Sequence, residues 1–150
     1  MEKKRRIYLD NAATTKPAAA VVEAMLPFLT EEFGNPSGLY ELATKNKKAV
    51  NQARRQLAAL LNCNHREIFF TSGGTESDNW ALIGIAEQLE SKGKHIITSS
   101  IEHHAILHSC DYLKKRGFEI SYLPVGEDGR INPKQLLKAM REDTVLVSVM

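Results

Sequence analysis

The chain has 150 residues, of which 43% are hydrophobic and 25% are charged, and 20 Lys and Arg against 18 Asp and Glu give a formal net charge of +2. This length allows one domain with a hydrophobic core, and the near-balanced charge offers no general attraction to nucleic acid or to an anionic membrane. No apolar run has the length of a membrane span or a signal peptide, so we expect a soluble cytoplasmic protein that binds neither nucleic acid nor membrane. Cys63 and Cys110 lie far apart, which argues against a disulfide framework and a cysteine-rich metal site.

The first 62 residues have the pattern of two helices. Apolar residues recur at helical spacing over 17–33, with a kink or break expected at Pro27, and again over 39–61. The loop 34–38, with the sequence GNPSG, separates the two segments. The basic run 3–6 precedes both, and it is predicted to be a solvated tail rather than a nucleic-acid arm, because it is too short for an arm.

From position 66 onward, short strand-like runs alternate with helical segments. This alternation is typical of an α/β fold in which helices cover a parallel sheet, and the spacing of the runs fits successive strand–helix–strand units. The segment 80–86 is apolar nearly all round, so its helix is expected to be buried. The predicted strands are Glu67–Thr71, His95–Thr98, Glu119–Leu123 and Thr144–Met150.

Glycine, asparagine and proline mark the expected helix ends. Gly93 and Gly117 each precede a predicted strand, where a left-handed residue commonly ends a helix, so both are predicted to be C-caps. Asn132 followed by Pro133 predicts an N-cap and a first helical residue, with Gln135 as the partner in a capping box.

The first strand is followed by a glycine-rich loop, 71–77, with the sequence TSGGTES. Ligands of open α/β sheets bind beyond the carboxyl ends of the strands, and Gly73 and Gly74 allow a close backbone approach there. Free N–H groups of the next helical turn and the loop hydroxyls could hold a phosphate, although a plain capped glycine turn has the same residues. The loop is neither G-x-G-x-x-G nor Walker A. The carboxylates of Glu76 and Asp78 would repel a phosphate and are expected to point away.

The loop 99–104 follows the second predicted strand and opens another helix. His103 is the candidate there to stack on, or hydrogen-bond, a ligand held by the glycine-rich loop. His104 and His108 lie four residues apart, but a third ligand is missing, so we predict surface histidines and no metal site. The last predicted strand ends with the sequence at Met150, without a following loop. We therefore expect an incomplete sheet.

Four stretches together resemble the N-terminal part of cysteine desulfurases of the NifS/IscS type, within the class V aminotransferase group of pyridoxal-phosphate (PLP) enzymes. They are YLDNAATT at 8–15, FGNPS at 33–37, FTSGGTESDN at 70–79 and EHH at 102–104. The resemblance follows the family's order and covers essentially the whole chain. It implies the type I aminotransferase fold, with 1–62 as an N-terminal helical segment and 63–150 as the first part of the PLP-binding large domain.

The resemblance also implies a site and a reaction. Gly74 and Thr75 are expected to hold the PLP phosphate, and His103 to stack on the pyridine ring and act as a catalytic residue in proton transfer. The implied enzyme takes sulfur from L-cysteine, giving L-alanine and an enzyme persulfide for iron–sulfur cluster assembly or thiolation. Its expected partners are a sulfur-acceptor or scaffold protein and a second copy of the full-length chain. The family's cofactor-bearing lysine and catalytic cysteine lie beyond the matching region, and Cys63 and Cys110 are predicted to be packing residues. The 150 residues alone are therefore expected to be inactive.

Two alternatives stay open. The first is a selenocysteine lyase or another class V aminotransferase-like PLP enzyme, although the FGNPS stretch at 33–37 favours the NifS/IscS branch. The second belongs to another class: a non-catalytic phosphate-binding or scaffold module that keeps the glycine-rich loop and lacks the remaining machinery.

Overall fold

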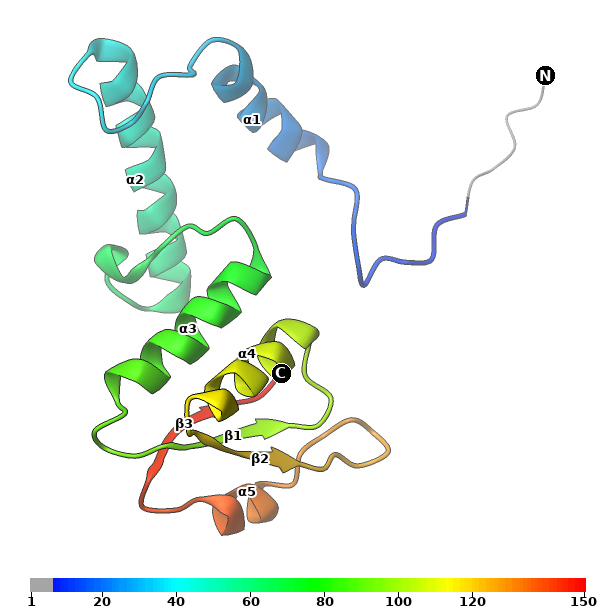
Figure 1. Ribbon diagram of the computed structural model, residues 1–150. Coiled ribbons are helices and arrows are strands. Elements are labelled where there is room, and N and C mark those ends of the chain that lie inside the picture. Colours follow the sequence, from blue (N-terminus) through cyan, green and yellow to red (C-terminus); the bar gives the residue numbers. More distant parts are fainter. Residues whose placement is uncertain (1–6) are drawn as a thin grey trace. The chain divides into compact units, whose positions relative to one another are not determined.

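A computed structural model describes residues 7–150 (Figure 1), so the basic run 3–6 lies outside the described residues. The chain divides into two compact units, one that ends at Phe69 and one from Phe70 to Met150. The division predicted at 62/63 concerns the domains of the parent fold and stays a prediction. Within 7–150, none of the helices combines the length and hydropathy that crossing a membrane requires.

The first unit contains two α-helices, α1 (Ala19–Thr30) and α2 (Glu41–Leu61), and the short 3-10 helix η1 (His65–Glu67). Of the kink or break predicted at Pro27, the break does not occur: α1 continues through Pro27 to Thr30, whose hydroxyl donates to the carbonyl of Leu26 at 2.9 Å. The kink stays a prediction. Asn46 is a buried residue of α2, and its Nδ2 donates to the carbonyls of Glu32 and Gly34 at 2.5 Å each. This amide therefore fastens the loop that follows α1 to α2.

The strand predicted at 67–71 is absent from the structure. Its first residue belongs to η1, where Asn64 and Glu67 form a capping box: Asn64 N donates to Glu67 Oε2 at 2.6 Å. Ile68 does have extended backbone, with φ −93° and ψ 120°, but its carbonyl accepts a side-chain bond from Arg54 Nε at 3.3 Å. Extended backbone becomes a strand only when a neighbouring strand pairs with it. Within 7–150 no segment does so.

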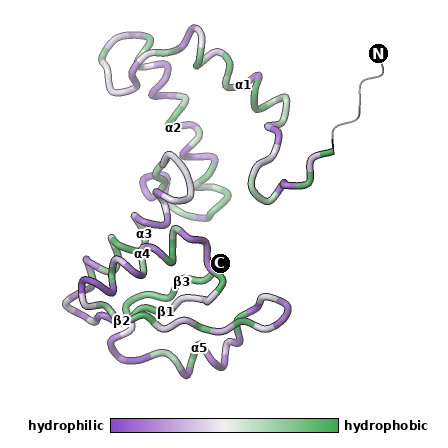
Figure 2. Tube along the Cα trace, turned by 45° about the vertical axis from the view of Figure 1, so that its right-hand side comes forward, coloured by the Kyte–Doolittle hydropathy of each residue, from purple (hydrophilic) through white to green (hydrophobic). Residues whose placement is uncertain are grey.

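The second unit is a parallel sheet of three strands in the order β2-β1-β3, with β1 at His95–Ser99, β2 at Glu119–Leu123 and β3 at Thr144–Ser148. The predicted α/β fold class is confirmed, as are the strands predicted in these three regions. Helices α3 (Gly74–Gln88) and α4 (His104–Lys115) cover one face, and α5 (Pro133–Ala139) lies on the other side (Figure 1). The apolar stretch of β3 is green in Figure 2. The core consists of Leu82, Ala86, Ile96, Ile106, Cys110, Leu113 and Phe118.

Helix α3 is less buried than its sequence predicts. Only Leu82 and Ala86 are buried, while Trp80 is 54% exposed and Ile85 is 38% exposed. The predicted packing of this helix on the sheet is confirmed, and the prediction that its apolar residues are buried is wrong for Trp80 and Ile85. Within the second unit, α3 packs against α4 and β3, and these neighbours cover one side of a helix that is apolar on several.

The predicted helix ends are confirmed at two of three places. Gly117 has a left-handed φ of 89° two residues after the end of α4, and Asn132 caps α5 with Pro133 in its first turn. The predicted capping box with Gln135 is not formed, because the Asn132 side chain accepts from Lys134 N at 2.9 Å while Gln135 N donates to the Asn132 carbonyl. Gly93 is not a C-cap, because α3 ends earlier and Gly93 is not among the left-handed residues. Position 93 requires glycine for a different reason, since a Cβ built there would lie 2.2 Å from the carbonyl oxygen of Asp143.

A buried histidine joins all three strands at the edge where β1 begins. The side chain of His95 is fully buried, with Nδ1 2.7 Å from Thr144 Oγ1 and Nε2 2.8 Å from Ser121 Oγ. Thr144 Oγ1 already accepts from Arg141 N at 2.8 Å. The threonine hydroxyl can therefore donate its proton to Nδ1, while Nε2–H donates to Ser121. This network fits the neutral ring.

Protonation of His95 is expected to destabilise the protein. Burial lowers the pKa of His95 below its ordinary value of 6.5, and Arg141 lowers it further, whereas Asp143 and Glu119 act in the opposite direction. The unfolded chain therefore binds a proton at His95 more readily than the folded chain does. The neutral His95 ring contributes its full stabilisation above pH 6.5. This contribution is lost as the pH falls from 6.5 toward the lowered pKa of the folded state, by no more than about 1.4 kcal/mol per pH unit.

Urea unfolding between pH 5 and pH 7 measures this dependence. The variant His95→Gln is less stable at neutral pH and is expected to lose the slope in that range, since the amide does not titrate. An identical slope in the variant and in the original protein would assign the pH dependence to other groups.

Candidate functional site

The predicted site residues gather at one edge of the second unit. The three strands are parallel, so their carboxyl ends share an edge of the sheet, and α3 and α4 both begin on that side (Figure 1). Gly74 and Thr75 form the first turn of α3, and His103 is the N-cap of α4. Because α3 and α4 pack against one another, the glycine-rich loop and the His103 loop belong to the same end of the same layer.

The glycine-rich loop presents backbone donors. Gly73 is the N-cap of α3 with extended backbone, φ 164° and ψ 178°, and its carbonyl accepts the first intrahelical bond from Ser77 N at 3.2 Å. The N–H groups of 74–76 precede that bond, so the helix offers them no acceptor. Ser77 Oγ is engaged with Thr71 Oγ1 at 2.7 Å. The hydroxyl of Thr75 and the three free N–H groups of 74–76 lie together at the positive end of the helix dipole, an arrangement that suits an anion.

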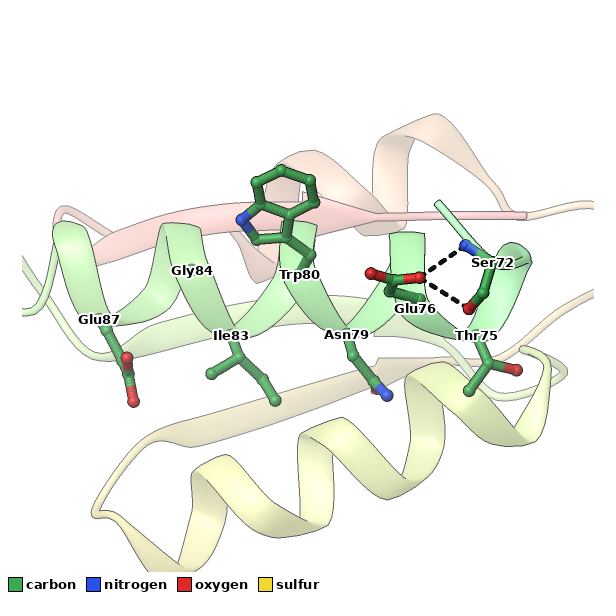
Figure 3. Close-up of a pocket in the computed structure, with 8 residues that line it drawn as sticks. All are labelled: Ser72, Thr75, Glu76, Asn79, Trp80, Ile83, Gly84 and Glu87. Atoms are coloured by element: carbon green, nitrogen blue, oxygen red, sulfur yellow. Dashed lines mark hydrogen bonds between the residues drawn. The ribbon is translucent and has the colours of Figure 1, made fainter. Parts of the chain in front are cut away.

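Space is available above these donors. A Cβ built on Gly73 or on Gly74 meets no heavy atom within 4 Å, so a ligand can approach the backbone there. An open groove of about 630 Å³ runs from this loop along α3 (Figure 3). It is lined by Ser72, Thr75, Glu76, Asn79, Trp80, Ile83, Gly84 and Glu87.

Glu76 does not point away from the loop as predicted. Its Oε2 accepts from the backbone N–H of Ser72 at 2.6 Å and from the Ser72 hydroxyl at 2.7 Å (Figure 3). The hydrogen bond from the Ser72 N–H lowers the pKa of Glu76 most, and the bond from the Ser72 hydroxyl lowers it further. The Glu76 carboxylate thus accepts both donors of Ser72 and holds the first part of the loop against the first turn of α3. The prediction for Asp78 stays a prediction.

His103 presents one ring nitrogen to its own helix. Nδ1 accepts from the backbone N–H of Ala105 at 3.1 Å, and the residue is exposed. An accepting Nδ1 carries no proton, so in the neutral ring the proton sits on Nε2. The cap therefore fixes both the tautomer and the direction of the ring, and leaves Nε2 for a ligand. The rings of His104 and His108 lie 5.6 Å apart, and the described residues contain no group of three or more side chains that could hold a metal ion.

Sequence reasoning missed the carboxylate that precedes His103. Glu102 is only 7% exposed, and its Oε1 accepts from Ser99 Oγ at 2.6 Å and from the backbone N–H of Met150 at 2.8 Å. The motif EHH drew attention to its histidines, whereas the partner of Glu102 lies 48 residues away and follows β3. Only the pairing of the strands could reveal it.

The two cysteines have different surroundings. Cys110 is a residue of α4 that is fully buried in the core, and burial raises the pKa of its thiol to about 11, so it is a packing residue as predicted. Cys63 is exposed, and the same prediction is wrong for it. It follows Asn62, whose left-handed backbone ends α2 and turns the chain away from the helix.

The fold and this edge define an α/β protein in which the start of α3 presents open backbone donors at the same sheet edge as a capping histidine. Comparison with known proteins gives the family: the profile described as aminotransferase class V matches residues 7–150, and the chain belongs to this family. It is 56% identical over 146 residues to a protein from Methanosarcina thermophila named cysteine desulfurase IscS. Among solved structures it is similar to a NifS-like protein, with a TM-score of 0.93 and 40% identity, and to SspA in complex with cysteine, with 0.86 and 38%.

These matches cover most of the chain but less than half of each relative. The alignment with the Methanosarcina protein takes in 97% of the chain and 36% of that protein. The alignments with the NifS-like protein and with SspA take in 97% and 92% of the chain, and 40% of each of those structures.

Proposed function

We propose that this chain provides part of the cofactor-binding domain of a PLP-dependent cysteine desulfurase. One observation carries the proposal: the start of α3 offers open backbone donors at the same edge of the sheet as the exposed ring of His103. The 56% identity to a protein named cysteine desulfurase IscS supports the choice of this reaction within the family.

The residues present fit PLP. Its phosphate needs several donors at close range, and the N–H groups of 74–76 with the Thr75 hydroxyl can supply them where a Cβ would meet nothing within 4 Å. The aromatic ring of PLP needs a flat partner, which the capped imidazole of His103 can provide. When bound, PLP supplies an electron sink for the bonds at the substrate's α-carbon. His103 would hold or move a proton at Nε2, since Nδ1 is engaged by Ala105 N.

The proposed reaction takes sulfur from L-cysteine, releases L-alanine and leaves a persulfide on the enzyme for iron–sulfur cluster assembly or thiolation. The lysine that carries PLP and the cysteine that accepts sulfur are proposed to lie outside residues 1–150. We further propose a cytoplasmic homodimer that passes sulfur to an acceptor or scaffold protein.

The full-length protein, loaded with PLP, is the material for the test. With L-cysteine we expect alanine and sulfide in equal amounts when a thiol reductant is present. Parallel assays with selenocysteine and with amino/keto acid pairs separate the other class V activities. Residues 1–150 alone, mixed with PLP and L-cysteine, are expected to give no turnover. Absence of alanine from the full-length protein would contradict the proposed reaction.

Removing the Thr75 hydroxyl is expected to weaken PLP binding. Thr75→Val keeps the shape of the side chain and removes a hydrogen bond to a charged phosphate, which corresponds to roughly a tenfold to hundredfold loss of affinity. Thr30→Val is the matched control, because Thr30 belongs to α1 and its exposed hydroxyl donates to the carbonyl of Leu26 at 2.9 Å, so the affinity for PLP is expected to stay nearly unchanged. Titration of the apo protein with PLP, followed by absorbance, measures both. Equal affinity of the valine variant and the original protein would place the phosphate elsewhere.

A further inference from the structure

Glu102 is a carboxylate that the structure buries, with 7% of the residue exposed, between β1 and α4. Removing a charged group from water is costly unless hydrogen bonds to the charged form compensate. Two such bonds reach the same oxygen: the Ser99 hydroxyl at 2.6 Å and the backbone N–H of Met150 at 2.8 Å. The burial of Glu102 is therefore compensated by partners on two different segments of the chain.

These partners join the ends of neighbouring strands. Ser99 is the last residue of β1, and Met150 lies two residues beyond the end of β3. The next residue of the loop, Ser100, donates its N–H to the carbonyl of Leu123 at the end of β2, at 2.9 Å. The loop that carries Glu102 is thus fastened to the carboxyl ends of both flanking strands, with the carboxylate as the link to β3.

His103 follows Glu102 directly and is held on its other side by α4. Its Nδ1 accepts from Ala105 N at 3.1 Å, which sets the direction of the ring relative to the helix. The bond between His103 and Ala105 lies within α4, so it does not set the position of the start of α4 relative to β3. The link from Glu102 to Met150 N supplies that second constraint.

We propose that Glu102 is a positioning residue: its buried carboxylate, through Ser99 Oγ and Met150 N, holds His103 in place over the carboxyl edge of the sheet. This role rests on the proposed function, in which His103 contacts the PLP ring. Glu102 itself contacts neither PLP nor substrate in this role. Misplacement of a catalytic group by about 1 Å can cost on the order of a hundredfold in rate, so a tether of this kind has consequences for turnover.

Three variants separate the tether from the charge and from folding. Glu102→Ala removes the acceptor. Glu102→Gln keeps an acceptor oxygen at the same reach and removes the charge. Ser99→Ala removes one donor and leaves the Met150 bond in place. Glu90→Ala is the control, because Glu90 is an exposed carboxylate paired with Lys94 at 2.6 Å in the turn after α3.

The first readout uses the full-length protein without PLP. Hydrogen–deuterium exchange, read by mass spectrometry, reports the opening of the segments 99–104 and 148–150. Glu102→Ala is expected to speed exchange in both segments by about tenfold, which is one broken hydrogen bond's effect on local opening. Glu102→Gln and Ser99→Ala are expected to give smaller increases, and Glu90→Ala none. Unchanged exchange in both segments of Glu102→Ala would overturn the tether.

The second readout uses the PLP-loaded full-length protein and L-cysteine. Glu102→Ala is expected to lower kcat by about tenfold while PLP occupancy and KM change little, because misplacing His103 affects the proton transfer rather than substrate capture. Glu102→Gln is expected to restore most of kcat. A wild-type protein without desulfurase activity overturns the proposed function and the role of Glu102 together. An active wild type with an equally active Glu102→Ala variant overturns the role of Glu102 alone.

Discussion

Replacing Gly93 by alanine is expected to lower the free energy of unfolding by about 3 kcal/mol, since overpacking and a lost hydrogen bond add. A Cβ at this position lies 2.2 Å from the carbonyl oxygen of Asp143 and 2.7 Å from its Cα, and both atoms are backbone. The same carbonyl accepts the N–H of His95 at 3.1 Å, at the place where β1 and β3 change register. The strand cannot move away without breaking that bond, so the cost cannot be relieved by a side-chain rotation.

Gly84→Ala is the matched control for this substitution. Gly84 lies inside α3, and the nearest atom to its Cβ would be Trp80 Cδ1 at 3.6 Å, an ordinary contact. Alanine is favoured over glycine in a helix interior, so this variant is expected to gain about 0.5 to 1 kcal/mol. Urea unfolding of the two variants measures both values. A Gly93→Ala variant as stable as the original protein would show that β3 yields at Asp143.

Truncating Leu113 is expected to cost between about 2 and 5 kcal/mol, the range for a buried leucine that leaves a cavity. Leu113 is fully buried near the end of α4, in the cluster that joins both covering helices to the sheet. Its neighbours in that cluster include Leu82 from α3 and Ile96 from β1. Leu113→Ala therefore removes contacts between three elements at once, and the groups around the cavity are held by the sheet.

Lys115→Ala, two residues along the same helix, is the control for Leu113→Ala. Lys115 is exposed, and a surface substitution of this kind is expected to change stability by no more than about 0.5 kcal/mol. Denaturant midpoints of both variants, at equal protein concentration, give the comparison. Similar midpoints for Leu113→Ala and for Lys115→Ala would mean that α4 is not held by this cluster.

The elements that sequence reasoning predicted well carry their own local signal. The runs that became β1, β2 and β3 are short and rich in β-branched or aromatic residues, and Gly117 ends α4 because a left-handed residue is needed there. The site roles of Gly74, Thr75 and His103 stay predictions, and the choice of Gly74 with Thr75 came from the family resemblance. Each of these residues follows a strand-like run and opens a helix, and loops at that junction of an α/β sheet bind ligands.

Two of the failures involve a partner that is distant in sequence. The segment 67–71 has residues typical of a strand, but strand pairing depends on a neighbour that its own sequence does not reveal. Gly93 was assigned to a helix end, whereas its role is to make room for Asp143. The third failure is local: the side chain of Glu76 was expected to avoid the loop, and it instead accepts two bonds from Ser72, four residues earlier.

The sequence by itself determined the class of fold and the order of the strands along the chain, and it placed two loops at strand–helix junctions. These follow from hydrophobic period, glycine position and capping, which act over a few residues. Only the tertiary structure decided that His95 joins three strands and that Glu102 reaches Met150. The reason is physical: a buried polar group must find a hydrogen-bond partner, and strand register, not sequence distance, sets which one lies within reach.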